Sequence, residues 1–123
     1  MGYQTDRKRA QGLGSAKTGT EHFWQMQVSS AALAVLVPVF VFSFGSILGA
    51  PHDVVLAYFA RPFPAIVAAL TLIVGFLHFK NGAQVVIEDY AQGGLRRALI
   101  IGTICLSYAC IAVGLFALIR LAL

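Results

Sequence analysis

Long apolar stretches separated by short polar segments run through the chain. The three longest are about Met26–Leu48, Phe63–Phe79 and Ala98–Leu118. Each is near the length of about 20 residues that an α-helix needs to cross the hydrocarbon core of a bilayer. The pattern therefore predicts an all-α integral membrane protein with three transmembrane helices. These helices are expected over about residues 25–49, 63–91 and 95–121.

The second predicted helix is longer than a bilayer requires. Pro62 and Pro64 mark its start, because proline is tolerated in the first turn of a helix, and no breaker follows before Gly93. At a rise of about 1.5 Å per residue, its roughly 29 residues span about 43 Å. We therefore expect this helix to project beyond the bilayer at its Tyr90 end, with His78 near its midpoint.

The segments outside the spans are polar. Residues 1–22 are basic and rich in Gly, Ser and Thr, without a periodic apolar face, and are predicted to form a largely extended tail. Residues 23–123 are expected to form one membrane domain of three helices. Between the first two spans, Pro51 and Asp53 are typical of the cap of a short helix, over residues 54–60, that lies flat at the membrane surface.

The composition agrees with a membrane protein. Of the 123 residues, 59% are hydrophobic and only 11% are charged, and the mean hydropathy is +0.80, which is too apolar for a soluble domain of this size. The net charge of +4 reflects membrane topology rather than nucleic-acid binding, because the spans divide the basic residues between two sides. Cys105 and Cys110 lie about 140° apart around a helix and cannot form a disulfide with each other.

The lysines and arginines predict the orientation in the membrane. Seven of the nine fall on the side of the N-terminus and the second connection, namely Arg7, Lys8, Arg9, Lys17, Lys80, Arg96 and Arg97. Arg61 and Arg120 fall on the other side. Because cytoplasmic segments carry an excess of Lys and Arg, we expect the N-terminus in the cytoplasm and the C-terminus outside.

The stretch His78–Tyr90 gathers ionisable and polar residues within and just beyond an apolar helix. Such residues are costly in a membrane span and indicate a functional site by default. His78 and Asp89 are about three turns apart, so they share a face and are offset by roughly 16 Å along the axis. Steps of four and three residues extend this face into a seam of Thr71, Gly75, His78, Gly82, Val85 and Asp89. The two glycines leave room beside His78 for a flat group or a close partner helix.

Several interpretations of these residues are open from spacing alone. His78 bonds a neighbouring helix, relays protons, or ligates a heme iron while the glycines accommodate the porphyrin. Tyr90 and Asp89 are an interfacial aromatic residue with a helix-end charge, or they bind a lipid-soluble quinone. In the second case the phenol donates to a quinone carbonyl and the carboxylate tunes proton delivery.

Polar residues also occur near the start of the first span. His22 is expected to be a solvated interfacial residue. Ser29 and Ser30 are expected to bond their own backbone or a neighbouring helix. For all three, contact with a ligand or cofactor is the alternative.

The spacing of the histidine, ten residues and then Asp-Tyr, in the second of three spans, resembles a known family. That family is the small hydrophobic membrane anchor subunit of succinate dehydrogenase, respiratory complex II. The segment GLGSAKTGTEHFW, residues 12–24, is also similar to alphaproteobacterial members. The resemblance covers nearly the whole chain.

The resemblance implies a role for each matching position. His78 matches the axial ligand of heme b, whose other ligand is a histidine of a sister anchor subunit, so this chain would supply half of a heme-binding bundle. Tyr90 matches the residue that hydrogen-bonds ubiquinone, and Asp89 is its acidic neighbour. An iron–sulfur subunit and a flavoprotein subunit would carry the dehydrogenase chemistry, which leaves this chain a non-catalytic subunit in the bacterial inner membrane. Gln27 stands where many relatives carry an arginine near the heme propionates, so their partner would be His22 or the sister subunit.

Two rival functions remain at this point. The anchor of a fumarate reductase would use the same parts with electron flow reversed. A small non-redox membrane protein, such as a transporter subunit or an assembly factor, would use His78 only for packing. A reduced b-type heme band in the absorbance spectrum of the purified complex would exclude the second.

Overall fold

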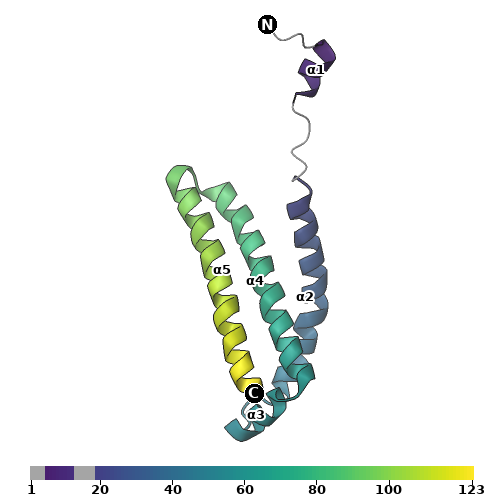
Figure 1. The fold of residues 1–123 in the computed structure, drawn as a ribbon, viewed down its shortest axis with the longest axis vertical. Helices are drawn as coiled ribbons and strands as arrows, with labels where there is room; N and C mark the ends of the chain where they lie inside the picture. Colours follow the sequence, from purple (N-terminus) through teal and green to yellow (C-terminus); the bar gives the residue numbers. More distant parts are fainter. Residues whose placement is uncertain (1–4, 13–18) are drawn as a thin grey trace.

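The computed structural model describes residues 5–12 and 19–123, and these residues form helices without strands. The elements in order are α1 (Asp6–Gln11), α2 (Glu21–Gly45), α3 (His52–Phe59), α4 (Pro62–Tyr90) and α5 (Gly93–Ala122). Figure 1 shows α2, α4 and α5 as three long helices, with α3 crossing one end of the bundle. The predicted all-α membrane class is confirmed, because three of the described helices are long and apolar enough to cross a membrane.

Helix α4 is the centre of the arrangement. It packs along both α2 and α5, whereas the backbones of α2 and α5 stay apart within the described residues. The small helix α3 touches α4 and α5 at the far end. A polar side chain of α4 that does not bond its own helix, as Thr71 does to the carbonyl oxygen of Val67 at 2.7 Å, must therefore find its partner on α2, on α5 or outside this chain.

The helix ends follow from local sequence. Helix α2 ends at Gly45, four residues before the predicted end, and the chain then turns through Gly49, whose φ of 81° lies in the left-handed region that favours glycine. Helix α4 begins directly with Pro62, as expected of proline in a first turn. At its other end, the two-residue connection to α5 is followed by Gly93 with a φ of 61°.

The tail departs from the extended conformation expected for it. Residues Asp6–Gln11 form helix α1, so the expectation is wrong for this stretch. Thr5 provides the physical reason, because its hydroxyl accepts a hydrogen bond from the backbone N–H of Lys8 at 3.3 Å and so caps the helix. Asp6 in the first turn also pairs with Arg9 at 3.7 Å. Residues 13–18, which include Lys17 and part of the family-like segment of residues 12–24, lie outside the described residues.

Few side chains are buried within this single chain. Ile47, Phe59 and Ala68 form a small apolar cluster where α3 meets α4. Most large apolar side chains of the three long helices are exposed, as expected where lipid or other subunits cover them. The most deeply buried side chain is that of Ser107, which is 1% exposed and donates to the carbonyl oxygen of Thr103 at 2.8 Å.

The α4–α5 contact depends on small residues. A Cβ atom added at Gly114 would collide with the side chain of Leu72, whereas one added at Gly102 would meet nothing within 4 Å. Small residues let membrane helices approach closely, and close approach is what generates van der Waals contact in the absence of a hydrophobic driving force between helices.

We predict that Gly114→Val lowers stability by about 1–3 kcal/mol, the usual cost of overpacking. Gly102→Val is the matched control on the same helix and should change stability little. The measurement is the midpoint of SDS-induced unfolding in detergent for the two purified variants. Equal midpoints would show that the added side chain at position 114 is accommodated without a cost to the α4–α5 contact.

Candidate functional site

Two polar contacts join α2 to α4. The Oγ atom of Ser29 lies 2.9 Å from Nδ1 of His78, and Nδ2 of Asn81 donates to Oε1 of Gln25 at 3.4 Å. Asn81 is only 5% exposed. The partner of the later residue on α4 is the earlier residue on α2, so the two helices run antiparallel. His78 lies level with Ser29, which is about 12 Å along the axis from the start of α2.

The seam predicted on α4 faces this contact. A Cβ atom added at Gly82 would come within 3.8 Å of the Cε atom of Met26, so α2 already occupies that position. A Cβ atom added at Gly75, on the other side of His78, would meet nothing within 4 Å. The glycines therefore differ: one accommodates the neighbouring helix, and the other leaves open space beside the half-buried histidine.

The ring nitrogens of His78 are in different environments. Nδ1 is engaged by Ser29, whose hydroxyl also donates to the carbonyl oxygen of Met26 at 3.0 Å. Nε2 makes no hydrogen bond to a described residue. His78 can thus offer a single nitrogen to a ligand, and no group of three or more His, Cys, Asp or Glu side chains that could hold a metal ion occurs in the described part of the chain.

The structure corrects the expectation that His22 is solvated. His22 is half-buried, and its Nε2 atom is buried without a hydrogen-bond partner among the described residues. The reason is that α2 already begins at Glu21, which places His22 in the first turn of the helix. Positions 22, 26 and 29 share one face of a helix, so His22 follows the face that Ser29 and Met26 turn toward α4.

Asp89 and Tyr90 lie apart from His78. Both are exposed, Tyr90 by 88%, at the end of α4. Tyr90 is twelve residues beyond His78, which is about 18 Å along the axis. Neither side chain has a hydrogen bond or ion pair with a described residue. This chain does not bring its sequence-predicted residues into one pocket; it spaces them along one helix.

The acidic residue with partners at this end is Glu88. Its Oε1 atom accepts a hydrogen bond from Gln84 at 3.0 Å and lies 3.6 Å from the guanidinium of Arg96 on α5. This ion pair ties the two helices together beside their connection. Sequence analysis missed it, because the pairing depends on how the connection folds back.

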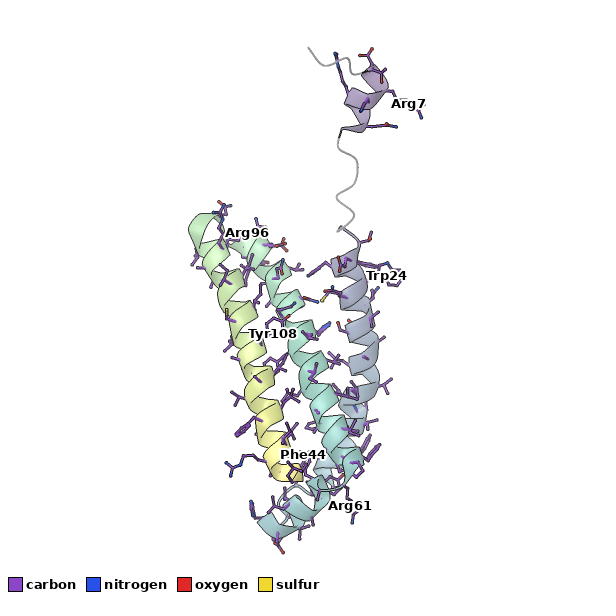
Figure 2. The ribbon with its side chains drawn as sticks, viewed as in Figure 1. Arg7, Trp24, Phe44, Arg61, Arg96 and Tyr108 are labelled. Atoms are coloured by element: carbon purple, nitrogen blue, oxygen red, sulfur yellow. The ribbon has the colours of Figure 1, made fainter. Side chains whose placement is uncertain are left out.

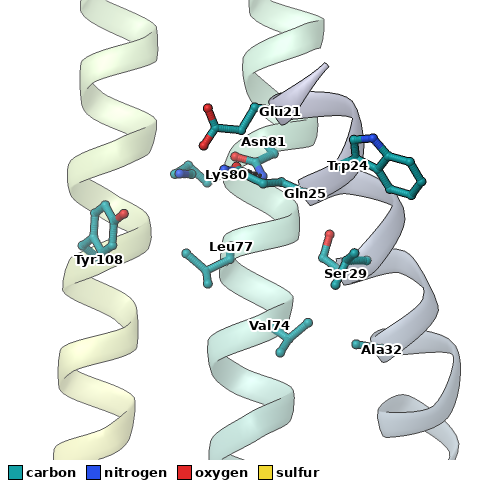
Figure 3. A pocket seen from close by; sticks show the side chains of 11 residues that line it. Glu21, Trp24, Gln25, Ser29, Ala32, Val74, Leu77, Lys80, Asn81 and Tyr108 are labelled. Carbon is teal, nitrogen blue, oxygen red and sulfur yellow. Dashed lines mark hydrogen bonds between the residues drawn. The ribbon is translucent and has the colours of Figure 1, made fainter. Parts of the chain in front are cut away.

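Lys80 points away from the seam and toward α5. Its Nζ atom lies 5.8 Å from the centre of the Tyr108 ring. Both residues line an open cavity of about 630 Å³ between the three long helices, together with Gln25, Asn81 and Trp24. Figure 3 shows polar side chains gathered at one end of this cavity and Val74, Leu77 and Ala32 at the other.

Ser29 and Ser30 behave as the sequence indicated. Both hydroxyls donate to the backbone carbonyl of Met26, and Ser29 in addition contacts the neighbouring helix through His78. Sequence analysis missed the pairing of Gln25 with Asn81. The signal was present, because a polar residue inside an apolar helix requires a partner, but the partner could not be chosen without the helix register.

These features define a class: a multi-pass helical membrane subunit with one histidine held at a helix contact beside open space. Residues 1–116 match the family model described as succinate dehydrogenase/fumarate reductase transmembrane subunit. The chain belongs to this family, as the resemblance implied.

Curated relatives agree with the family model. The chain is 48% identical over 123 residues to the succinate dehydrogenase hydrophobic membrane anchor subunit of Paracoccus denitrificans. The matched region covers 100% of this chain and 95% of that protein. It is 29% and 32% identical to the subunits of that name from Rickettsia conorii and Rickettsia bellii, over 80% of each chain. No solved structure matches the chain significantly. The function supported at this level is that of a succinate dehydrogenase membrane anchor subunit.

We predict that Asn81→Ala lowers stability by about 0.5–2 kcal/mol, the range of hydrogen bonds between membrane helices. The substitution leaves Gln25 without its partner on α4 and opens a gap at a buried position. Gln84→Ala is the control, since it removes an exposed hydrogen bond on the same helix. Thermal unfolding of the purified complex in detergent would reveal the difference, and identical midpoints would show that the contact contributes nothing.

Proposed function

We propose that this chain anchors a succinate:ubiquinone oxidoreductase in the bacterial inner membrane, that His78 ligates heme b, and that Tyr90 and Asp89 contribute to the ubiquinone site. The observation that carries the proposal is the environment of His78. Its Nδ1 atom is held by Ser29 while the neighbouring Gly75 faces open space.

The residues present fit a heme. An axial histidine needs one free ring nitrogen, a fixed ring and room for the porphyrin, and His78 with Gly75 meets these needs. The buried, unpartnered Nε2 atom of His22 supports a further contact. His22 lies near the start of α2, on the same face as Ser29. There it would pair with a heme propionate, a role that the arginine of many relatives would fill at the position of Gln27. When bound, the heme would supply a one-electron carrier within the membrane.

The second iron ligand would come from a sister anchor subunit. This chain offers one histidine at the seam, and many of its large apolar side chains are exposed. A second membrane subunit packed on the open side of His78 would cover that face and complete the coordination of the iron. Membrane lipid would cover the rest.

The exposed end of α4 suits a quinone site that other subunits complete. A phenol at Tyr90 donates one hydrogen bond, and that bond strengthens as a quinone oxygen gains negative charge on reduction. Asp89 supplies a carboxylate beside it for proton delivery. Because neither residue has a partner in the described chain, we assign the rest of the pocket to the sister anchor and the iron–sulfur subunit. The flavoprotein subunit would oxidise succinate upstream.

The charge distribution supports a cytoplasmic N-terminus. Figure 2 shows Arg96 and Trp24 at the end of the bundle from which the tail leaves, and Arg61 at the opposite end. The excess of basic residues at the first end is the pattern of cytoplasmic segments. This orientation directs Tyr90 toward the cytoplasm, where soluble subunits that oxidise succinate would dock.

A fumarate reductase anchor is the second candidate, because the family description covers both enzymes. The three relatives are all named as succinate dehydrogenase subunits, which favours the succinate-oxidising direction. A non-redox membrane protein is disfavoured by the family itself.

We predict that His78→Ala removes the low-spin b-type heme from the purified complex, because the substitution deletes the only nitrogen that the seam offers to the iron. The measurement is the reduced-minus-oxidised absorbance spectrum, normalised to the amount of flavin. His52→Ala in the exposed α3 is the control and should leave the spectrum unchanged. An intact heme band in the His78 variant would refute the ligand assignment.

We predict that Tyr90→Phe lowers quinone turnover by roughly ten- to a hundredfold. The ring and its packing remain, but the donor is lost, and a hydrogen bond to a charged acceptor contributes about 1.5–3 kcal/mol. Asp89→Asn should have a smaller effect that depends more on pH, because it perturbs proton supply. The assay compares succinate-driven reduction of a soluble quinone with that of a dye that accepts electrons upstream. Equal loss of both activities would show that Tyr90 only supports assembly.

A further inference from the structure

The hydroxyl of Ser29 lies between two hydrogen-bond partners and so favours one tautomer of His78. Its oxygen lies 3.0 Å from the carbonyl oxygen of Met26 and 2.9 Å from Nδ1 of His78. A serine hydroxyl has a single proton to donate and two lone pairs with which to accept. It can therefore satisfy both contacts only in one way: it donates to Met26 and accepts from an N–H at Nδ1.

This arrangement selects one form of the imidazole. With its proton on Nδ1, neutral His78 carries the free lone pair on Nε2. Nε2 is also the nitrogen without a hydrogen bond to any described residue. The tautomer that satisfies Ser29 is thus the tautomer that can ligate a metal ion, and the helix contact holds the ring in place.

We propose that Ser29 is a positioning residue that fixes the Nδ1–H tautomer of His78 and tunes it as an iron ligand. The inference rests on the proposed role of His78. A hydrogen-bond acceptor at the non-ligating nitrogen orients an axial histidine and raises its basicity, and such partners change metal affinity by about 10- to 100-fold. A more basic imidazole favours ferric over ferrous iron, so Ser29 lowers the reduction potential of the heme.

The chain provides a matched control one residue away. Ser30 donates to the same carbonyl oxygen of Met26, at 2.8 Å, but it is exposed and does not contact His78. Ser30→Ala therefore reproduces the loss of a hydroxyl from this turn of α2, including its effect on the backbone. Any difference between the two alanine variants isolates the contact with the imidazole.

The experiment is a redox titration of the heme in the purified complex. Ser29→Ala should shift the ferric-to-ferrous preference by up to about tenfold toward ferrous, which for one electron is a rise of about 59 mV in midpoint potential. Heme content after detergent washing should fall as well. Ser30→Ala should match the unsubstituted complex in both measurements. Equal potentials in the two alanine variants would overturn the proposal.

Two further variants keep the test decisive if Ser29→Ala fails to assemble. In Ser29→Cys the new side chain is close to serine in shape, but sulfur is a weak hydrogen-bond acceptor. The midpoint potential of the heme in this variant should therefore rise. Ser29→Thr keeps the hydroxyl, which can still donate to the preceding turn, so its potential should stay near that of the unsubstituted complex. A cysteine variant without a shift, or a threonine variant shifted as far as cysteine, would refute the role of the hydroxyl.

The outcome for Ser29 is separable from the outcome for His78. If His78→Ala loses the heme while the Ser29 variants keep an unchanged potential, the ligand assignment stands and only the positioning role fails. If His78→Ala keeps the heme, the proposed function of His78 fails first, and the Ser29 proposal fails with it.

Discussion

The polar contact between α2 and α4 is the interaction on which the arrangement depends. Hydrocarbon cannot satisfy a buried imidazole or amide, so each of these groups on α4 needs a partner on a neighbouring helix. Ser29 and Gln25 supply those partners to His78 and Asn81. Two such contacts, one turn apart, define both the register and the rotation of α2 against α4. The apolar side chains around them permit many registers, but the polar pairs favour one.

The other side of α4 is held differently. There α5 packs through the small residues Gly114 and Ser107, and an exposed ion pair between Glu88 and Arg96 lies near the connection. Since the backbones of α2 and α5 stay apart, α4 serves as the central helix and most of the remaining apolar surface faces outward. A three-helix layer of this kind encloses little interior of its own. It is suited to a subunit whose environment is lipid on some faces and other subunits elsewhere.

The spacing along α4 places the two candidate residues in different environments. His78 lies inside the bundle, where packing limits its motion, and Tyr90 lies about 18 Å away at an exposed helix end. The inner position would suit the heme proposed at His78, and the exposed position would suit the quinone proposed at Tyr90, which must enter and leave. One continuous helix sets the distance between them, because its rise per residue is invariant. The geometry within this chain therefore positions both residues without forming a complete pocket around either.

The sequence by itself determined the membrane class, the long helices and the seam that carries His78 and Asp89. Each of these depends on hydropathy or helical period, which are local properties of the chain. The short helix α1 escaped this reasoning, because it is stabilised by the cap at Thr5 and by side-chain charge rather than by an apolar face. Only the tertiary structure decided that Ser29 contacts Nδ1 of His78 and that the Nε2 atom of His22 is buried. It also decided that Gly82 lies against Met26 while Gly75 faces open space. Those outcomes depend on the rotation and register of α2 relative to α4, which arise from packing and from the pairing of polar groups between residues about fifty positions apart.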